Sequence, residues 1–390
     1  MVNCTGFENQ SLTASWVRIP PLPRGSACGG DERERWDEGP AFRERRGHRF
    51  RNRTKEKQSM NQIFPDKLKA GDVVRVIAPA RSLSMEWINN ETMKTVANQR
   101  FADLGLKLTF GEHVYEIDDF NSSSIESRLD DLHTAFTDNQ VKMIITVIGG
   151  FNSNQLLQYI NYDLISKNPK ILCGYSDITA LANAIYAKTG LVTYSGPHYF
   201  SFGDKKGIDY TLDYFKKCFF SDDPFELVPS EKWSNDRWIE QQDTRTFTKN
   251  EGYWMINPGF SDGVIAGGNQ CTLNLLQGTE YMPNISDCIL FLEDDYEAHV
   301  TTFDRDLQSI LHQLNFKQVK GIVIGRFQPE TGMTRELLTQ IIKSKRELNN
   351  LPVVANVDFG HTTPLITFPI GGNCQLELSS SESKITISKH

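Results

Sequence analysis

The pattern that most constrains the fold is a repeated alternation of short apolar runs with longer amphipathic segments, which begins after Met60. Residues 73–78 (VVRVIA) and 143–148 (MIITVI) are rich in β-branched side chains and predict buried strands. Residues 93–104 and 125–136 carry apolar side chains at helical spacing and predict helices, and residues 153–160 resume that spacing. Strands that alternate with helices in this way are typical of parallel sheets with crossover helices, so the sequence predicts an α/β fold.

The second half of the chain repeats the alternation. Apolar runs at residues 288–292, 321–324 and 353–357 predict strands, and helices are predicted between them at residues 303–314 and 335–348. The end of the chain, CQLELSSSESKITIS, alternates apolar and polar residues around a Ser-rich turn and predicts a hairpin. Because 390 residues are too many for one ordinary core, we expect two domains. The first is a parallel-sheet α/β domain, and the second is a smaller, β-rich α/β domain.

The expected domain boundaries follow changes in composition. The first part is Pro-rich and then dense in charge, without a helical or strand period, so we expect it to be disordered or an artefactual extension before a natural start at Met60. The alternative is a basic regulatory arm at residues 43–57. The expected parts are an extension at 1–59, a nucleophile domain at 60–230, an interdomain Trp-bearing loop at 231–262 and a C-terminal domain at 263–390.

Charge and cysteine content exclude several classes of protein. The net charge of -7 argues against nucleic acid or an anionic membrane as partner, since both attract basic surfaces. The sequence contains no apolar run long enough to span a bilayer and no signal-peptide pattern. Seven cysteines without a CxxC pair indicate neither a disulfide framework nor a zinc site. We therefore expect a cytoplasmic location.

Ser176 lies where a predicted buried strand at residues 171–173 meets a helix that ends near Gly190. Backbone N–H groups and the helix dipole favour developing negative charge at such a helix start, and Gly174 permits a tight turn. A serine hydroxyl here fits a nucleophile that a base must activate. The alternative is that Ser176 or Asp177 caps the helix, because GYSD lacks the second glycine of the GxSxG elbow.

Three further residues also follow predicted strands. Gly150 fits an oxyanion hole together with the N–H of Asp177. Glu293 and His361 follow two strands of the second half. Sites in α/β sheets gather beyond the carboxyl ends of strands, and the order Ser, Glu, His is that of a known triad. We therefore predict that His361 is the general base and acid and that Glu293 orients it.

Each of these residues has a plainer interpretation. Gly150 fits a β-turn, and His361 fits a loop histidine. Glu293 belongs to an acidic run with Asp294 and Asp295, which is typical of a solvated surface or of a divalent-cation site. A metal-dependent hydrolase therefore stays an alternative at this point. His198 and His299 are further possible binding residues.

Five segments in fixed order resemble the LD-carboxypeptidase family of serine peptidases from about Met60 to the end of the chain. They are ITVIGGFNSNQLL, ILCGYSDITALANAIYAKTGLVTYSGP, GVIAGGNQCTLNLLQGT, LFLEDDYE with FDRDL, and DFGHTTP with PIGGN. The resemblance implies that Ser176 is the nucleophile, Glu293 the acid and His361 the base, while Gly150 and Asp177 supply the oxyanion N–H groups. It also implies a homodimer that needs neither a metal nor an organic cofactor.

Two branches of that family differ in substrate. Housekeeping members remove the terminal D-alanine of a murein tetrapeptide, and microcin C immunity-type members cleave an aminoacyl-nucleotide amide. The second branch carries a Trp-bearing loop that stacks on the base, which is worth about 1 to 3 kcal/mol. Trp233, Trp238, Tyr253 and Trp254 lie in such a polar stretch here, although these rings could instead pack the domain junction.

The expected function is therefore that of a microcin C immunity-like serine carboxypeptidase, with a small peptide or an aminoacyl nucleotide as substrate. A housekeeping murein tetrapeptide carboxypeptidase is the first alternative. A catalytically silent binding protein on the same fold is the second, although the intact Ser, Glu and His residues argue against it.

Overall fold

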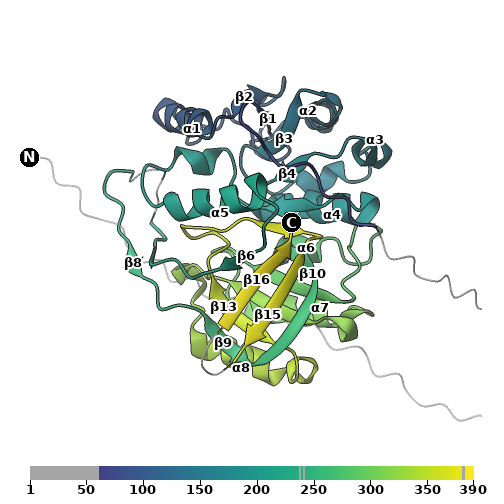
Figure 1. Cartoon of the computed structure of the whole chain (residues 1–390), viewed down its shortest axis with the longest axis vertical. Helices are drawn as coiled ribbons and strands as arrows, with labels where there is room; N and C mark the ends of the chain where they lie inside the picture. The colour runs from purple at the N-terminus through teal and green to yellow at the C-terminus, as the bar shows by residue number, and fades with distance from the viewer. Residues whose placement is uncertain (1–60, 237–238, 240–241, 380–382) are drawn as a thin grey trace, which may run out of the picture. The chain divides into compact units, whose positions relative to one another are not determined.

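The computed structural model describes residues 61–236, 239, 242–379 and 383–390. The extension predicted at residues 1–59 lies outside the described residues. Two β-sheets form the framework of the described part of the chain (Figure 1). They confirm the predicted two-domain α/β architecture.

The first sheet has six strands in the order β14-β5-β4-β3-β1-β2. β1 to β5 are parallel, and β14 pairs antiparallel with β5. The parallel order 2-1-3-4-5 places a topological switch point between β1 and β3, where a crevice is expected at the carboxyl ends. The strands are β1 (Val73–Ile77), β2 (Lys107–Phe110), β3 (Val141–Thr146), β4 (Ile171–Cys173), β5 (Thr193–Ser195) and β14 (Phe368–Ile370).

The second sheet has eight strands in the order β6-β16-β15-β10-β11-β12-β13-β9. Its centre, β10 to β13, is parallel, and antiparallel strands flank it on both sides. The strands are β6 (Phe225–Leu227), β9 (Trp254–Asn257), β10 (Gly259–Asn269), β11 (Cys288–Glu293), β12 (Gly321–Gly325), β13 (Val353–Val357), β15 (Asn373–Leu378) and β16 (Ser383–Lys389). A separate two-stranded ribbon consists of β7 (Lys232–Trp233) and β8 (Thr248–Lys249).

Amphipathic helices cover these sheets. In α1, for example, Met93, Ala97 and Phe101 recur at helical spacing and are all buried, while Asn90 caps the first turn. Figure 1 shows α1, α2 and α3 with the first sheet and α7 and α8 with the second. The helices are α1 (Glu91–Asp103), α2 (Ile125–Thr137), α3 (Tyr162–Lys167), α4 (Thr179–Thr189), α5 (Asp209–Phe220), α6 (Gln270–Asn274), α7 (Val300–Leu311) and α8 (Arg335–Ser344).

Helix α4 joins the two sheets, because its polar side chains bond directly to β10. The fully buried Asn183 amide donates to the carbonyl of Gly267 at 2.8 Å and accepts from its N–H at 3.3 Å. One turn earlier, the Thr179 hydroxyl accepts from the N–H of Asn269 at 2.9 Å. A Cβ on Gly268 would lie 2.5 Å from the Thr179 oxygen. The glycine pair therefore permits the close approach of helix and strand.

Most predicted elements are confirmed, and the differences have local causes. The strand at 171–173, the helix end at Gly190 and the C-terminal hairpin pairing are all present. The helix expected at residues 153–160 is wrong: only a 3-10 turn, Ser153–Leu156, forms there. Ser153 bonds to Asp177 through both its N–H and its hydroxyl, and Asn161 caps α3, so the chain turns before an α-helix can extend.

The segment at residues 231–262, expected to be an interdomain loop, also contains sheet structure. It includes the ribbon of β7 and β8, all of β9 and the start of β10. β9 pairs with β13, and the buried Asn257 side chain bonds to the carbonyls of Leu348 and Leu351. Trp254, which the sequence offered as a ligand contact, is thus the first residue of a strand of the second sheet.

Among the described residues, no helix combines the length and the apolar character that crossing a bilayer requires.

Two buried apolar clusters fill the space around the sheets. Each cluster includes residues of both the first and the second sheet. The two halves of the described chain therefore share cores in addition to the polar bonds of α4.

We expect Asn183→Ala to lower the free energy of unfolding by about 2 to 4 kcal/mol, because it leaves the buried N–H and carbonyl of Gly267 without partners. Chemical denaturation measures this change. Asn139→Ala, at an exposed position, is the matched control and should change stability by less than about 0.5 kcal/mol. Equal stability of the two variants would contradict this account of the α4–β10 contact.

Candidate active site

Ser176 occupies a strained turn between β4 and α4. Its φ is +61°, in the left-handed region that residues other than glycine rarely adopt. The turn is tightly enclosed, since a Cβ on Gly174 would lie 2.4 Å from the Thr146 hydroxyl oxygen. Ser176 begins the 3-10 turn that leads into α4, so its side chain lies at the N-terminal end of the helix. This strained backbone makes a simple helix cap a poor explanation for the residue.

The loop after β3 packs against the same turn. A Cβ on Gly149 would lie 2.9 Å from the Ser176 Cβ and 3.0 Å from its hydroxyl oxygen. Gly150 follows and lines the cavity at Ser176. Within the described residues, the Gly150 N–H donates no hydrogen bond to the protein. The buried Asp177 carboxylate accepts from the Ser153 N–H at 2.9 Å, which fixes the helix start against this loop.

His361 and Glu293 reach Ser176 from the second sheet. His361 Nε2 lies 3.0 Å from Ser176 Oγ, and His361 Nδ1 lies 2.8 Å from Glu293 Oε2. Glu293 is the last residue of β11 and is buried, while His361 follows β13. Gly360 has φ +109°, and a Cβ there would lie 2.9 Å from Glu293 Oε2. Glycine is therefore required beside the carboxylate.

Electrostatics favour a charged imidazole at this position. Burial alone would lower the pKa of His361, but the carboxylate of Glu293, its hydrogen bond and the charges of Asp295 and Asp294 outweigh burial and raise that pKa to about 9. Burial and the like charges of Glu293 and Asp295 raise the pKa of Asp294 to about 8. Near pH 7 Asp294 is therefore mostly protonated, and Glu293 supplies most of the field at His361.

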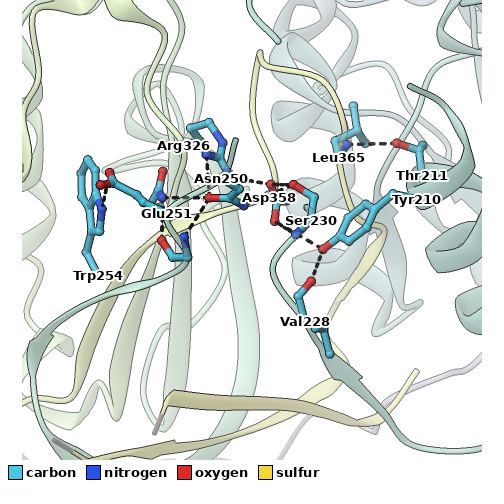
Figure 2. Close-up of polar contacts among 12 residues, drawn as sticks. Tyr210, Thr211, Val228, Ser230, Asn250, Glu251, Trp254, Arg326, Asp358 and Leu365 are labelled. Atoms are coloured by element: carbon cyan, nitrogen blue, oxygen red, sulfur yellow. Dashed lines mark hydrogen bonds and ion pairs between the residues drawn. The ribbon is translucent and has the colours of Figure 1, made fainter. Parts of the chain in front are cut away.

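A buried ion pair holds the loop that carries His361. Arg326 follows β12, and Asp358 lies three residues before His361. The Arg326 guanidinium donates to Asp358 Oδ1 at 2.5 Å, and neither side chain is more than 4% exposed. Ser230 donates to the same carboxylate through its hydroxyl at 2.7 Å and its N–H at 2.8 Å (Figure 2). With the Tyr210 hydroxyl at 3.4 Å, the carboxylate accepts from four donors at the base of the loop.

The segment between the sheets is fastened on both sides of His361. Ser230 bonds to Asp358 before it, and Ser234 forms a two-way backbone bridge with Thr363 after it, at 2.8 and 2.9 Å. Asn250 accepts from Arg326 at 3.3 Å and donates to Ser230 at 3.2 Å, as Figure 2 shows. The His361 loop and the intersheet segment therefore form one hydrogen-bonded unit.

Two neighbouring cavities are lined by His361, and the smaller of them is also lined by Ser176. The smaller has a volume of about 150 Å³ and is bounded by residues of both sheets, among them Arg81, Gly150, Ser176 and His361. The larger has a volume of about 610 Å³. The cavities share Ile148, Tyr175, Tyr296 and His361. Ser234, Asn235, Asp236 and Ile239 of the intersheet segment line the larger cavity.

The structure brings together five of the residues singled out in the sequence: Ser176, Glu293, His361, Gly150 and Asp177. The tryptophans behave differently. The Trp233 ring lies over the Arg326 guanidinium at 5.0 Å, and Trp254 Nε1 donates to Glu251 at 2.9 Å. Neither is among the lining residues of these two cavities. Trp238 lies outside the described residues, so its contact with substrate stays a prediction.

Other lining residues carried little signal in the sequence. Trp87, half-exposed, lines the larger cavity, and Tyr296 lines both. His198, noted as a possible binding residue, lines the smaller one and stacks on Tyr175 with ring centroids 4.4 Å apart. Burial and the neighbouring His361 lower the pKa of His198 to about 3, so it is neutral. The position of Arg81 after β1 was the available signal for that residue, because it follows a predicted strand.

The acidic run does not gather into a metal site. In the described part of the chain, the group whose carboxylate and imidazole atoms lie within 4.8 Å of one another is Glu112, His113 and Asp130. That group is partly exposed, and Asp294 and Asp295 do not belong to it. Asp294 instead accepts from the buried Asn269 amide at 3.3 Å. The divalent-cation alternative at Asp294 and Asp295 thus finds no support in the geometry.

A serine hydroxyl, an imidazole and a carboxylate in hydrogen-bonded sequence, at the end of a strand and the start of a helix, are typical of serine hydrolases. The chain belongs to the LD-carboxypeptidase family. Residues 74–196 match the N-terminal domain of that family, and residues 262–376 match its C-terminal domain. The protein is therefore a serine-type peptidase, as the sequence motifs predicted.

Among relatives, the chain is 53% identical over 328 residues to YocD of Bacillus subtilis (strain 168). This alignment covers 84% of this chain and 100% of YocD. The chain is 32% identical over 297 residues to the microcin C7 self-immunity protein MccF of Escherichia coli, covering 72% and 84% of the two chains. The murein tetrapeptide carboxypeptidase of Pseudomonas aeruginosa is 24% identical over 310 residues, covering 78% and 92%.

Solved structures show the same fold. An MccF-like protein from Bacillus anthracis superposes with a TM-score of 0.82 at 54% identity, covering 84% of this chain and 100% of that one. MccF in complex with glutamyl sulfamoyl guanosine has a TM-score of 0.75 at 28% identity, covering 84% and 98%. The two-sheet architecture is therefore that of this family.

We expect Asp358→Leu to lower the free energy of unfolding by about 3 to 5 kcal/mol, because it leaves the buried Arg326 charge unpaired. Asp358→Leu combined with Arg326→Met should cost less than the two single changes added together, as a double-mutant cycle in urea would measure. Asp213→Ala, in the exposed Lys217–Asp213 pair, is the control and should cost less than about 1 kcal/mol. Additive effects of Asp358 and Arg326 would contradict the proposed coupling.

Proposed function

We propose that this protein hydrolyses an amide bond at the end of a small substrate through a Ser176–His361–Glu293 triad and an acyl-enzyme. The observation that carries the proposal is the continuous chain of two hydrogen bonds, 3.0 Å from Ser176 Oγ to His361 Nε2 and 2.8 Å from His361 Nδ1 to Glu293. A serine hydroxyl becomes an effective nucleophile when a base in this position removes its proton.

In the first step Ser176 Oγ attacks the amide carbon while its proton passes to His361 Nε2. The tetrahedral intermediate then collapses: the C–N bond breaks, and His361 donates the proton to the departing nitrogen. Water attacks the resulting ester with His361 again as base, which releases the acid and restores Ser176. Glu293 keeps the Nδ1 proton of His361 in place and stabilises the imidazolium that forms in each half-reaction.

The oxyanion is best stabilised by the N–H groups of Gly150 and Asp177. Gly150 lines the cavity beside Ser176, and its N–H is without a protein acceptor in the described structure. Asp177 follows Ser176 at the helix start, where the dipole favours negative charge. Removal of one such donor typically costs roughly 3 kcal/mol of transition-state stabilisation.

For substrate we propose an aminoacyl nucleotide or a similar conjugate, as in the microcin C immunity branch. MccF, a relative, has been solved with glutamyl sulfamoyl guanosine. In this chain a second, larger cavity opens beside His361 and offers Trp87 and Tyr296 as aromatic surfaces. Aromatic rings can stack on a base for about 1 to 3 kcal/mol.

A murein tetrapeptide is the second candidate substrate. The same cavity is also lined by Asn235, Asp236, Gln328 and Glu330, which suit a polar peptide. The homodimer implied by the family resemblance, and the cytoplasmic location expected from the sequence composition, belong to this proposal as well. The cysteines in the described residues are all free thiols, which fits a reducing compartment.

We expect Ser176→Ala to reduce kcat/KM by about 10⁴-fold or more, and a phosphonate probe should label Ser176 in the unaltered protein, as peptide mapping would detect. Ser166→Ala, on α3, is the control and should retain activity and labelling. Normal turnover by Ser176→Ala would contradict the proposal. Binding of both substrate classes without hydrolysis of either would favour a catalytically silent binding protein.

The same assays compare an aminoacyl sulfamoyl adenosine with a murein tetrapeptide. A higher kcat/KM for the nucleotide conjugate is the expected result. A higher value for the tetrapeptide would leave the triad in place and assign the chain to the murein branch.

We expect kcat/KM to rise with pH around a midpoint near pH 9 and to level off above it, because His361 must lose its proton before it can act as base. Glu293→Gln removes the charge that raises the His361 pKa, so the rise should shift to lower pH by more than about one unit and the plateau should fall. Asp295→Asn is the graded comparison, with a smaller downward shift. An unchanged midpoint in Glu293→Gln would contradict the assignment of Glu293.

A further inference from the structure

Arg81 lies beside the catalytic serine at the switch point of the first sheet. It follows β1, while Gly150 follows the neighbouring β3, and ligands of such sheets bind in the crevice between the two. The two loops are in contact, since a Cβ on Gly150 would lie 3.1 Å from Arg81 Cγ. Arg81 therefore reaches the smaller cavity on the same wall as the Gly150 N–H.

The Arg81 guanidinium has no carboxylate or other hydrogen-bond partner among the described residues. It lies over the ring of Phe151, 4.9 Å from the ring centroid, and Phe151 is itself 66% exposed. Within the described residues, the Arg81 side chain forms no hydrogen bond or ion pair. Of the residues that line the cavity at Ser176, it is the one Arg or Lys. A half-buried guanidinium without a carboxylate favours an anionic ligand.

The neighbouring Arg128 has a structural role and provides a comparison for Arg81. Arg128 lines the adjacent cavity together with Arg81, but it is 3% exposed and each of its three guanidinium nitrogens donates a hydrogen bond. They bond to the carbonyls of Ser124, Pro79 and Asn152 and to the Gln155 side chain. Arg128 therefore holds the loops, whereas Arg81 is left free to bind.

The opposite wall of the cavity carries the opposite charge. Asp295 and Glu297, from the loop after β11, line the cavity that Arg81 lines from the first sheet. These groups do not pair with Arg81, and Asp295 contributes to the field at His361 instead. An anion on the substrate is repelled by that wall and attracted to Arg81, so the charge pattern gives the substrate one orientation in the cavity.

We propose that Arg81 binds the anionic group that the departing amine carries. This inference rests on the proposed hydrolysis at Ser176. A peptide that ends in a free carboxylate bears its charge one carbon beyond the departing nitrogen, and an acyl phosphoramidate or sulfamate bears it on or next to that nitrogen. Both leaving groups therefore present an anion at nearly the same place, and Arg81 accounts for selection of a chain end over an internal amide.

Binding to Ser176→Ala protein tests the inference without turnover. By calorimetry, Ser176→Ala should bind a murein-type peptide ending in D-alanine about 10- to 100-fold more tightly than the same peptide with a C-terminal amide. Ser176→Ala/Arg81→Gln should bind the two peptides equally. Ser176→Ala/Arg335→Gln, which removes an exposed arginine on α8, is the matched control and should keep the preference.

An aminoacyl sulfamoyl adenosine forms the second arm and distinguishes the two sources of the anion. Loss of affinity on Arg81→Gln for the free-acid peptide alone assigns a carboxylate, and loss for the nucleotide conjugate alone assigns the sulfamate. A preference for the free acid that survives Arg81→Gln, together with unchanged affinity for the conjugate, would overturn the inference, as would failure of all these ligands to bind. Hydrolysis by the unaltered protein is measured separately, so failure of the proposed function appears there and not in the binding arms.

Discussion

The close contact between α4 and β10 is the constraint on which the site depends. Ser176 follows β4 of the first sheet, whereas Glu293 ends β11 and His361 follows β13 of the second. Their hydrogen bonds therefore require the two sheets to be held in a fixed relative position. The Asn183 amide bonds to both backbone groups of Gly267, beyond the point where β15 stops pairing with β10. At Gly267, helix α4 thus provides the hydrogen bonds that a neighbouring strand would otherwise form. Because it starts at the Ser176 turn, its docking also sets the position of the hydroxyl.

Charge at the site is concentrated on one side of the imidazole. Burial opposes protonation of His361, and Glu293 with its acidic neighbours more than reverses that effect. In the proposed mechanism, the imidazolium that forms during acylation is therefore well stabilised, while a neutral imidazole is harder to maintain. Asp294, with its own pKa raised to about 8, contributes charge mainly above that pH. Glu293 is thus the main control on the protonation of His361 near neutrality.

The sequence was sufficient for features that depend on local pattern. Strand ends at Gly150, Ser176, Glu293 and His361 followed from apolar runs, and the rule that sites collect at carboxyl ends brought them together. Long-range contacts away from those strand ends were beyond that reasoning. Nothing in the pattern pairs Arg326 with Asp358, or places β14 in the first sheet. Trp254 illustrates the same limit, because an aromatic residue in a polar stretch suits a ligand surface and an edge strand equally well.

The same hydrogen bonds hold the His361 loop and the segment that lines the larger cavity. The segment that contributes Ser234, Asn235 and Asp236 to the larger cavity is bonded to Asp358 before His361 and to Thr363 after it. Asp358 is in turn held by the buried Arg326. A ligand that displaces this segment must therefore move the His361 loop or break buried hydrogen bonds, each of which is costly to lose. A ligand that fits it leaves the imidazole within hydrogen-bond distance of Ser176, so the proposed triad and the wall of the larger cavity would depend on the same ligand shape.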